Sequence, residues 1–164
     1  MTKANRGENM ALTIHDIADR FEINDLLVRY CYAVDDRDWD SYQKVFTPDA
    51  VIDDTIIGGV RSGVEDHIVF MKKALAKIKI SQHAISTVLL TVHGNEANTR
   101  VHCSCPMVVD VGDGKTQFFS RFITMCRTGL HSDQPPNHAL QRTAAGCRDC
   151  NRRASWPPSL SLGR

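Results

Sequence analysis

The spacing of apolar residues in this chain changes near residue 80, and this change constrains the fold more than any other feature. Before it, apolar residues recur every three or four positions, which is the period of an amphipathic helix. After it, the sequence is rich in Ile, Val, Thr and Leu, as strands are. Helices followed by a run of strands predict an α+β fold, with helices packed on an antiparallel sheet.

The first half of the chain predicts a long helix. Thr13 is a suitable N-cap, and Asp16 places an acid in the first helical turn. An amphipathic stripe follows, formed by Ile23, Leu27, Tyr30, Cys31 and Val34. The acidic run 35–38 interrupts this stripe, so we expect the helix to end there.

Two shorter helices are expected after it. One runs from Trp39 to the turn at Thr47-Pro48-Asp49, because the residue before a proline disfavours helical geometry. A short strand at 50–52 and a Gly58-Gly59 loop come next, and a further helix covers about 64–77.

Three long strands are expected in the second half, at 80–92, 98–111 and 116–126, with turns at 93–96 and 112–114. Consecutive strands joined by short turns predict an antiparallel meander. Helices packed on one face of such a curved sheet would leave a conical cavity that suits a small ligand.

The 164-residue length suits one domain, which we expect at 13–126 after a flexible N-terminus at 1–12. Residues 127–164 have no periodic apolar pattern and are expected to be an atypical, disordered tail. This tail has six Arg and two Asp, a charge of about +4, so the remainder is near −3 within the total of +1. A mildly acidic body argues against nucleic acid as a partner. The absence of a membrane-spanning run or a signal-peptide pattern predicts a cytoplasmic protein.

Asp35 and His83 are the candidate catalytic residues. Asp35 follows the buried stripe at the helix C-terminus, where the helix dipole and burial both disfavour a carboxylate charge. His83 opens a long strand on the face that it would share with Ile85, Thr87 and Leu89. Spacing alone leaves the commoner alternatives open, a solvated helix-terminal acid and a strand histidine bonded to backbone.

No metal or cofactor is expected. The six cysteines are expected to be free thiols, because the chain shows no secretion signal. The single C-x-x-C pair at Cys147 and Cys150 is weak evidence for zinc. No phosphate-binding glycine loop, nucleophile elbow or zinc-protease motif is present.

The run from Tyr32 to Ala50 resembles the opening of SnoaL-like proteins of the nuclear transport factor 2-like superfamily. It contains Asp35, the step Asp38-Trp39 and the turn Phe46-Thr-Pro-Asp-Ala50. Gln82-His83-Ala84-Ile85 is similar to the histidine-bearing strand start of the same family. Within the superfamily, the scytalone dehydratases and hexachlorocyclohexane dehydrochlorinases are nearest in motif, and the resemblance covers about residues 12–126.

The resemblance implies a catalytic dyad with His83 as the base and Asp35 as its orienting partner, working without a cofactor. It also implies a substrate pocket, lined by Tyr30, Val34, Trp39, Asp54, Phe70 and Phe122. Val34 and Asp54 stand where the dehydratases carry tyrosines. Residues 127–164 do not match the usual final strand, so the fold is expected to lack it, through truncation or fusion of the gene.

The expected function is a lyase of dehydratase or dehydrohalogenase type, or an isomerase, on a small apolar cyclic or polyketide-like molecule. Two alternatives remain, because a fold does not determine a function. One is a non-catalytic ligand-binding module, and the other is an assembly subunit like the small β-subunit of ring-hydroxylating dioxygenases. The resemblance also implies a homodimer or homotrimer.

Overall fold

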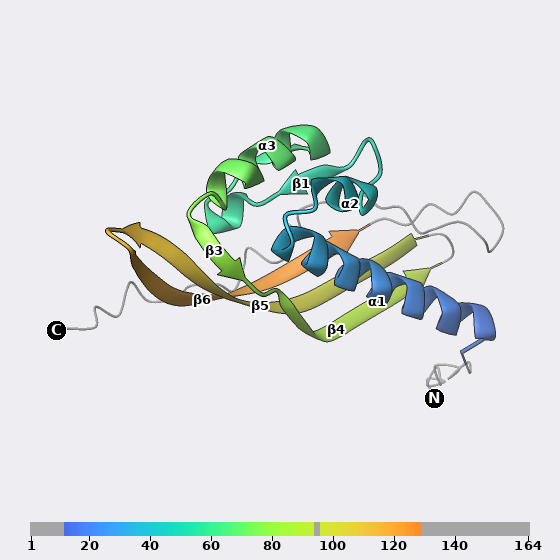
Figure 1. Ribbon diagram of the computed structural model, residues 1–164. Coiled ribbons are helices and arrows are strands. Elements are labelled where there is room, and N and C mark those ends of the chain that lie inside the picture. Colours follow the sequence, from blue (N-terminus) through green and yellow to red (C-terminus); the bar gives the residue numbers. More distant parts are fainter. Residues whose placement is uncertain (1–11, 94–95, 129–164) are drawn as a thin grey trace, which may run out of the picture.

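A computed structural model describes residues 12–93 and 96–128, in which the helices lie on one side of a curved antiparallel sheet (Figure 1). Helix α1 (Ile14–Asp35) begins at a capping box, in which Thr13 and Asp16 each accept a hydrogen bond from the other's backbone N–H. It ends at Asp35, as the acidic run predicts. The predicted stripe of α1 is buried at Ile23, Leu27, Cys31 and Val34.

Helix α2 (Trp39–Lys44) is held at its start by Asp38, whose carboxylate accepts a hydrogen bond from the Ser41 backbone N–H at 3.0 Å. Hydrogen bonds from the Ser41 side chain and backbone lower the pKa of Asp38. The short strand β1 (Val51–Asp53) and the turn η1 (Thr55–Ile57) follow. Strand β2 (Arg61–Gly63) pairs with β1 in a small antiparallel hairpin. The short strand expected at 50–52 corresponds to β1, whereas the three-residue β2 is not predicted by the sequence pattern.

Helix α3 (Val64–Ala74) is shorter than the expected 64–77. Its last residues turn instead into strand β3 (Ile78–Ser81), with the Ile78 backbone N–H donating to the Leu75 carbonyl at 3.0 Å. Figure 1 shows α2 and α3 on the same side of the sheet as α1.

The main sheet is built around the long strand β5 (Glu96–Gly112). Strands β3 and β4 (Ala84–His93) pair with successive stretches of one edge of β5, and β6 (Lys115–Thr128) pairs along its other edge. The single strand expected at 80–92 is therefore two strands with a break at Gln82 and His83. The break arises because the His83 backbone N–H donates to the Asp35 carboxylate, at 2.6 Å, and not to a strand.

A β-bulge corrects the predicted face of β4. The register shifts between Ser86 and Leu89, and Thr87 adopts a left-handed φ of +51°. His83, Ile85, Thr87 and Leu89 do not share one face, because Thr87 and Leu89 are exposed. Beyond the bulge the inward positions pass to Leu90 and Val92, which pack against Ile23 of α1.

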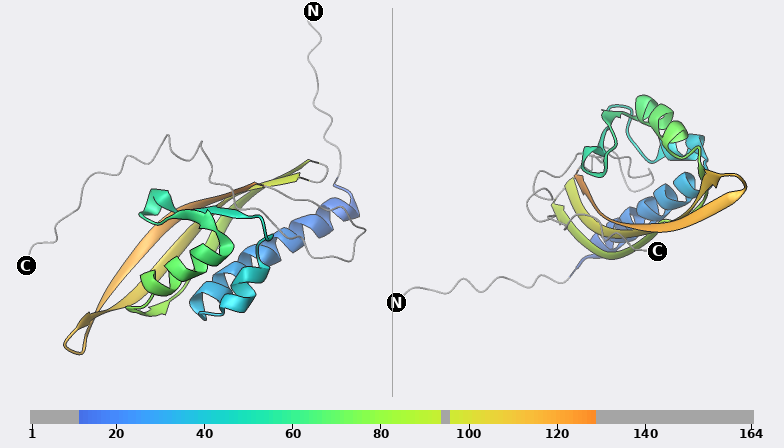
Figure 2. Two further views of the ribbon diagram at one scale, coloured as in Figure 1. Left: turned by 90° about the horizontal axis from the view of Figure 1, so that it is seen from above. Right: turned by 90° about the vertical axis from the view of Figure 1, so that its left-hand side faces the viewer.

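The sheet curves around α1, as the end-on view in Figure 2 shows. The main core lies between the C-terminal half of α1, α2, β1 and α3, and its buried members are Leu26, Ala33, Val34, Tyr42, Val45, Phe46, Ala50, Ile52, Val64 and Met71. Helices packed on a curved antiparallel sheet confirm the predicted α+β architecture.

Within the described residues, β6 pairs with β5 alone, so its other edge has no strand beside it there. Strand β6 continues to Thr128, slightly past the expected 116–126. The expectations for residues 1–11 and 129–164, including the Cys147 and Cys150 pair, lie outside the described residues.

Candidate active site

Asp35 and His83 are in direct contact. The last residue of α1, Asp35, faces the break between β3 and β4, and its Oδ1 lies 2.7 Å from His83 Nδ1. Its Oδ2 accepts the His83 backbone N–H at 2.6 Å. The side chain of Asp35 is 16% exposed and that of His83 is 10% exposed, so the pair is largely shielded from solvent. An ionised carboxylate only accepts hydrogen bonds, so in this geometry the ring hydrogen of a neutral His83 is on Nδ1 and donates to Asp35, and Nε2 is the acceptor nitrogen.

Ser81 holds the Asp35 carboxylate, and Arg37 in turn holds Ser81. The Ser81 hydroxyl donates to Asp35 Oδ1 at 2.9 Å and accepts from Arg37 Nη1 at 3.1 Å. Arg37 also donates to the carbonyls of Val34, at 2.6 Å, and Ile78, at 3.3 Å, so it ties the end of α1 to β3. Arg37 itself has a left-handed φ of +60° immediately after the helix. A carboxylate with this many donors is fixed in one orientation.

Three buried cysteines lie around the dyad, on α1 and β5. Cys105 Sγ is 3.2 Å from His83 Nε2, and burial raises the pKa of the Cys105 thiol to about 12. Cys103 lies two residues before Cys105, on the same face of β5. A hydrogen bond from Cys31 of α1 lowers the pKa of Cys103. Cys105 is therefore a neutral thiol next to Nε2, the ring nitrogen of His83 that does not contact Asp35.

The residues predicted to line a pocket are placed in different surroundings. Tyr30 lies edge-on to His83, with ring centroids 6.5 Å apart. Val34 is fully buried in the main core, and Trp39 packs edge-on against Tyr42 at 6.0 Å. Phe70 packs against His67, and Phe122 lies on β6, paired with Ser104. The structure thus brings Tyr30 to the dyad, and it places Trp39 and Phe70 in a neighbouring aromatic group.

Asp54, the sixth of these residues, belongs to a second hydrogen-bonded chain. Its Oδ2 lies 3.1 Å from His67 Nε2, and His67 Nδ1 lies 2.9 Å from the Tyr42 hydroxyl. His67 and Tyr42 are fully buried, whereas the Asp54 side chain is 27% exposed. The carboxylate accepts from Nε2–H, so the Tyr42 hydroxyl donates to Nδ1 and both ring nitrogens are satisfied. The Tyr42 and Tyr30 rings, 5.7 Å apart, link this chain to the dyad.

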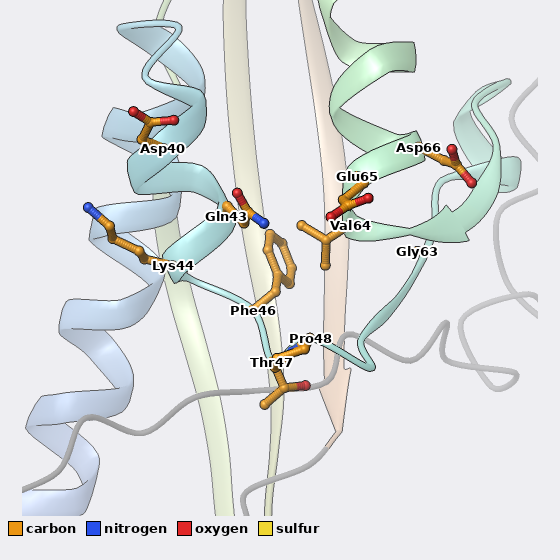
Figure 3. A pocket seen from close by; sticks show the side chains of 10 residues that line it. All are labelled: Asp40, Gln43, Lys44, Phe46, Thr47, Pro48, Gly63, Val64, Glu65 and Asp66. Atoms are coloured by element: carbon orange, nitrogen blue, oxygen red, sulfur yellow. The ribbon is translucent and has the colours of Figure 1, made fainter.

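A cavity of about 680 Å³ lies between α2 and the start of α3 (Figure 3). Its lining combines charged and apolar side chains, and consists of Asp40, Gln43, Lys44, Phe46, Thr47, Pro48, Gly63, Val64, Glu65 and Asp66. None of the six predicted pocket residues lines it. Phe46 of the cavity lining packs against Tyr30, with ring centroids 6.3 Å apart, and Tyr30 in turn packs against His83. The side chains of Phe46 and Tyr30 therefore lie between this cavity and His83.

Several residues that make these hydrogen bonds are absent from the sequence-based prediction. His67 shares its helical spacing with Val64 and Met71, which could have marked it as buried. Cys105 shares the spacing of two residues with Val101, Cys103 and Met107, which are all buried, so the sequence could also have predicted that it points inward. Nothing local predicts the contacts of Ser81 with Asp35 and with Arg37, because they depend on how β3 meets the end of α1.

Two kinds of site are also absent within residues 12–93 and 96–128. No group of three His, Cys, Asp or Glu side chains there could hold a metal ion. None of the helices in the same described ranges combines the length and apolar character that a membrane crossing needs.

Comparison with known proteins gives the same fold. The uncharacterized protein Rv2910c of Mycobacterium tuberculosis is 35% identical over 108 residues, which cover 66% of this chain and 73% of that protein. A Novosphingobium aromaticivorans protein named provisionally as an aromatic ring hydroxylase is 25% identical, with a TM-score of 0.61 over 77% of this chain and 85% of that one. A protein of the same species named provisionally as a scytalone dehydratase is 16% identical, with a TM-score of 0.52 over 82% and 99% of the two chains.

The family assignment rests on most of the described structure. Residues 15–131 match the SnoaL-like domain, a span that begins in α1 and takes in every helix and strand described above. The chain therefore belongs to the SnoaL-like family and has the α+β fold of nuclear transport factor 2-like proteins.

Proposed function

We propose that this protein is an acid–base enzyme that needs no cofactor, either a lyase of dehydratase or dehydrohalogenase type or an isomerase. The observation that carries the proposal is the contact between Asp35 and His83, with Oδ1 to Nδ1 at 2.7 Å. A histidine held by a carboxylate on one ring nitrogen has its other nitrogen available as a base. The substrate class that we infer is a small, largely apolar cyclic or polyketide-like molecule.

In the lyase reaction, His83 Nε2 takes a proton from a carbon beside the one that bears the leaving group. The electron pair of that C–H bond forms the new double bond, and the leaving group departs with the electrons of its own bond. The Asp35 carboxylate stabilises the imidazolium that forms, since it accepts the Nδ1 hydrogen throughout. In the isomerase reaction, the same proton returns to a different carbon.

Tyr30 is the aromatic residue best placed to contact a substrate at the dyad, because its ring lies edge-on to that of His83. Val34, Trp39, Asp54, Phe70 and Phe122 remain proposed pocket residues. Of these, Val34 is fully buried and would support the pocket from the core side. Asp54 would contribute a partly exposed carboxylate fixed by His67.

The test is turnover of a panel of hydroxylated cyclic ketones and halogenated cyclic hydrocarbons by the protein and by its variants. His83→Ala should lower kcat by about 10²- to 10⁴-fold, which is the usual contribution of a general base. His102→Ala is the matched control, because His102 is an exposed histidine on β5. Equal activity of His83→Ala and His102→Ala would refute the proposal. Ligand binding that survives loss of either Asp35 or His83, with no product formed, would indicate a binding module.

A second candidate is an assembly subunit of a larger oxygenase. It is favoured by the 25% identity to the Novosphingobium aromaticivorans protein named provisionally as an aromatic ring hydroxylase. Large apolar side chains on the surface fit a partner chain, among them Ile14, Phe21 and Phe118, which are 84%, 69% and 68% exposed. Sedimentation of the isolated chain separates the candidates. A homodimer or homotrimer with turnover of its own supports the enzyme, and an inert chain that acquires activity with a partner supports the subunit.

A further inference from the structure

Cys105 lies next to the nitrogen of His83 that is proposed to act as the base. Its Sγ lies 3.2 Å from Nε2, the ring nitrogen opposite the one that contacts Asp35. Cys105 is fully buried on β5. The pairing of β4 with β5 brings the two residues together, because Ala84 stands opposite Ser104 and Ile85 opposite Cys103.

The direction of this hydrogen bond follows from the partners on each side. Asp35 receives hydrogens from the His83 backbone, the Ser81 hydroxyl and the His83 ring, so the ring hydrogen is on Nδ1. Nε2 is then an acceptor. Burial and the neighbouring Cys103 and Asp35 raise the pKa of Cys105 to about 12, against weaker opposite effects of Arg121 and Arg37. The thiol keeps its hydrogen and donates it to Nε2.

We propose that Cys105 is a positioning residue that caps the His83 base in the resting protein, its thiol hydrogen standing where a substrate proton must go. The inference deepens the proposed function and rests on it in taking Nε2 as the base. A thiol is a weak donor, so the cap holds the imidazole in place and is displaced at small cost when a substrate arrives.

The same three residues form an Asp–His–Cys sequence of contacts, which also suggests a nucleophilic cysteine. Two observations argue against that role. The sulfur is fully buried, and the neutral thiol is a poor nucleophile compared with a thiolate. The cap accounts for the contact without requiring a covalent bond to the sulfur.

The experiment needs no substrate. Diethyl pyrocarbonate acylates the unprotonated nitrogen of an imidazole, so the rate at which His83 is modified, followed by mass spectrometry of its peptide, reports whether Nε2 is capped. Cys105→Ala should raise this rate about three- to tenfold, the factor that one neutral hydrogen bond contributes. Cys105→Ser retains a donor and should stay near the rate of the unmodified sequence. Cys103→Ala is the control, since Cys103 is equally buried on the same face of β5 but is hydrogen-bonded to Cys31.

Nitrogen-15 NMR of the His83 ring provides the second readout, and the neutral imidazole should show hydrogen on Nδ1 and none on Nε2. An unchanged labelling rate in Cys105→Ala, or a hydrogen found on Nε2, would overturn the cap. An equal rise in Cys103→Ala would also overturn it, since the effect would then come from lost packing. The outcome is separable from that of the proposed function. Turnover that survives His83→Ala would refute the catalytic role of His83 without altering either readout.

Discussion

Asp35 contacts His83 through both carboxylate oxygens, one on the backbone N–H at 2.6 Å and the other on the ring at 2.7 Å. The backbone contact takes the hydrogen that a continuous strand would give to its neighbour. The ring contact orients the imidazole. The break between β3 and β4 and the formation of the dyad therefore have one cause, and the sheet is interrupted where the candidate base lies.

Replacement of Ser81 by alanine removes the hydroxyl between Asp35 and Arg37. We expect kcat to fall about tenfold, the value of one hydrogen bond to a charged group, with little change in KM because Ser81 acts only through Asp35. Ser81→Thr should restore most of the loss. Ser86→Ala, at an exposed position on β4, is the control. Steady-state kinetics with the best substrate of the panel checks this, and a loss confined to KM would contradict it.

The raised pKa of Cys105 predicts a loss of stability at alkaline pH. Its ordinary pKa is 9.0, and burial raises it to about 12 in the folded chain. Between these values the unfolded chain releases the thiol proton and the folded chain retains it, so the free energy of unfolding falls as pH rises. Urea unfolding across this range should show a steeper fall for the unmodified sequence than for Cys105→Ser. Parallel pH profiles of the two proteins would show that the thiol stays near its ordinary pKa.

Tyr42→Phe removes the hydroxyl that donates to His67 Nδ1 and leaves this buried nitrogen without its donor. The expected decrease in the free energy of unfolding is about 1–3 kcal/mol, the cost of an unsatisfied buried polar group. Tyr32→Phe makes the same chemical change at a side chain that is 66% exposed, and it should alter stability by less than about 0.5 kcal/mol. Denaturant unfolding of both variants measures the difference. Similar values for the two would mean that the His67 chain adds no stability.

Gly59 is close to the Asp54 side chain, and a Cβ added at Gly59 would lie 2.6 Å from Asp54 Cβ. Gly59→Ala should therefore displace Asp54 from His67 and lower the free energy of unfolding by about 1–3 kcal/mol, as overpacking does. Gly63→Ala is the control, because a Cβ there has no neighbour within 4 Å. Thermal unfolding checks the difference, and a Gly59→Ala melting temperature no lower than that of Gly63→Ala would disprove the clash.

Local sequence predicted the features that local contacts determine. The capping box at Thr13 and the end of α1 near Asp35 follow from residues a few positions apart. The break at His83 and the bulge at Thr87 do not, because the first depends on a carboxylate from α1 and the second on a strained backbone within β4. A continuous Val-, Ile- and Thr-rich run contains no sign of either.

The candidate site shows the same division. Asp35 and His83 were paired by family resemblance, since their separate spacings favoured ordinary structural roles. His67 is not among the residues predicted for the site, although its spacing from Val64 and Met71 places it on the buried face of α3. The contact between His83 and Cys105 could not be predicted, because it depends on the register between β4 and β5.

The bulge at Thr87 has a consequence for how β4 packs. The extra residue lets the two halves of β4 alternate out of phase, so that Ile85, in phase with the preceding His83, faces inward in one half and Leu90 and Val92 in the other. The second half packs against the N-terminal part of α1 at Ile23, away from Asp35. The strand therefore serves two separate packing regions, a small core at Ile23 and the region of the imidazole at the other end.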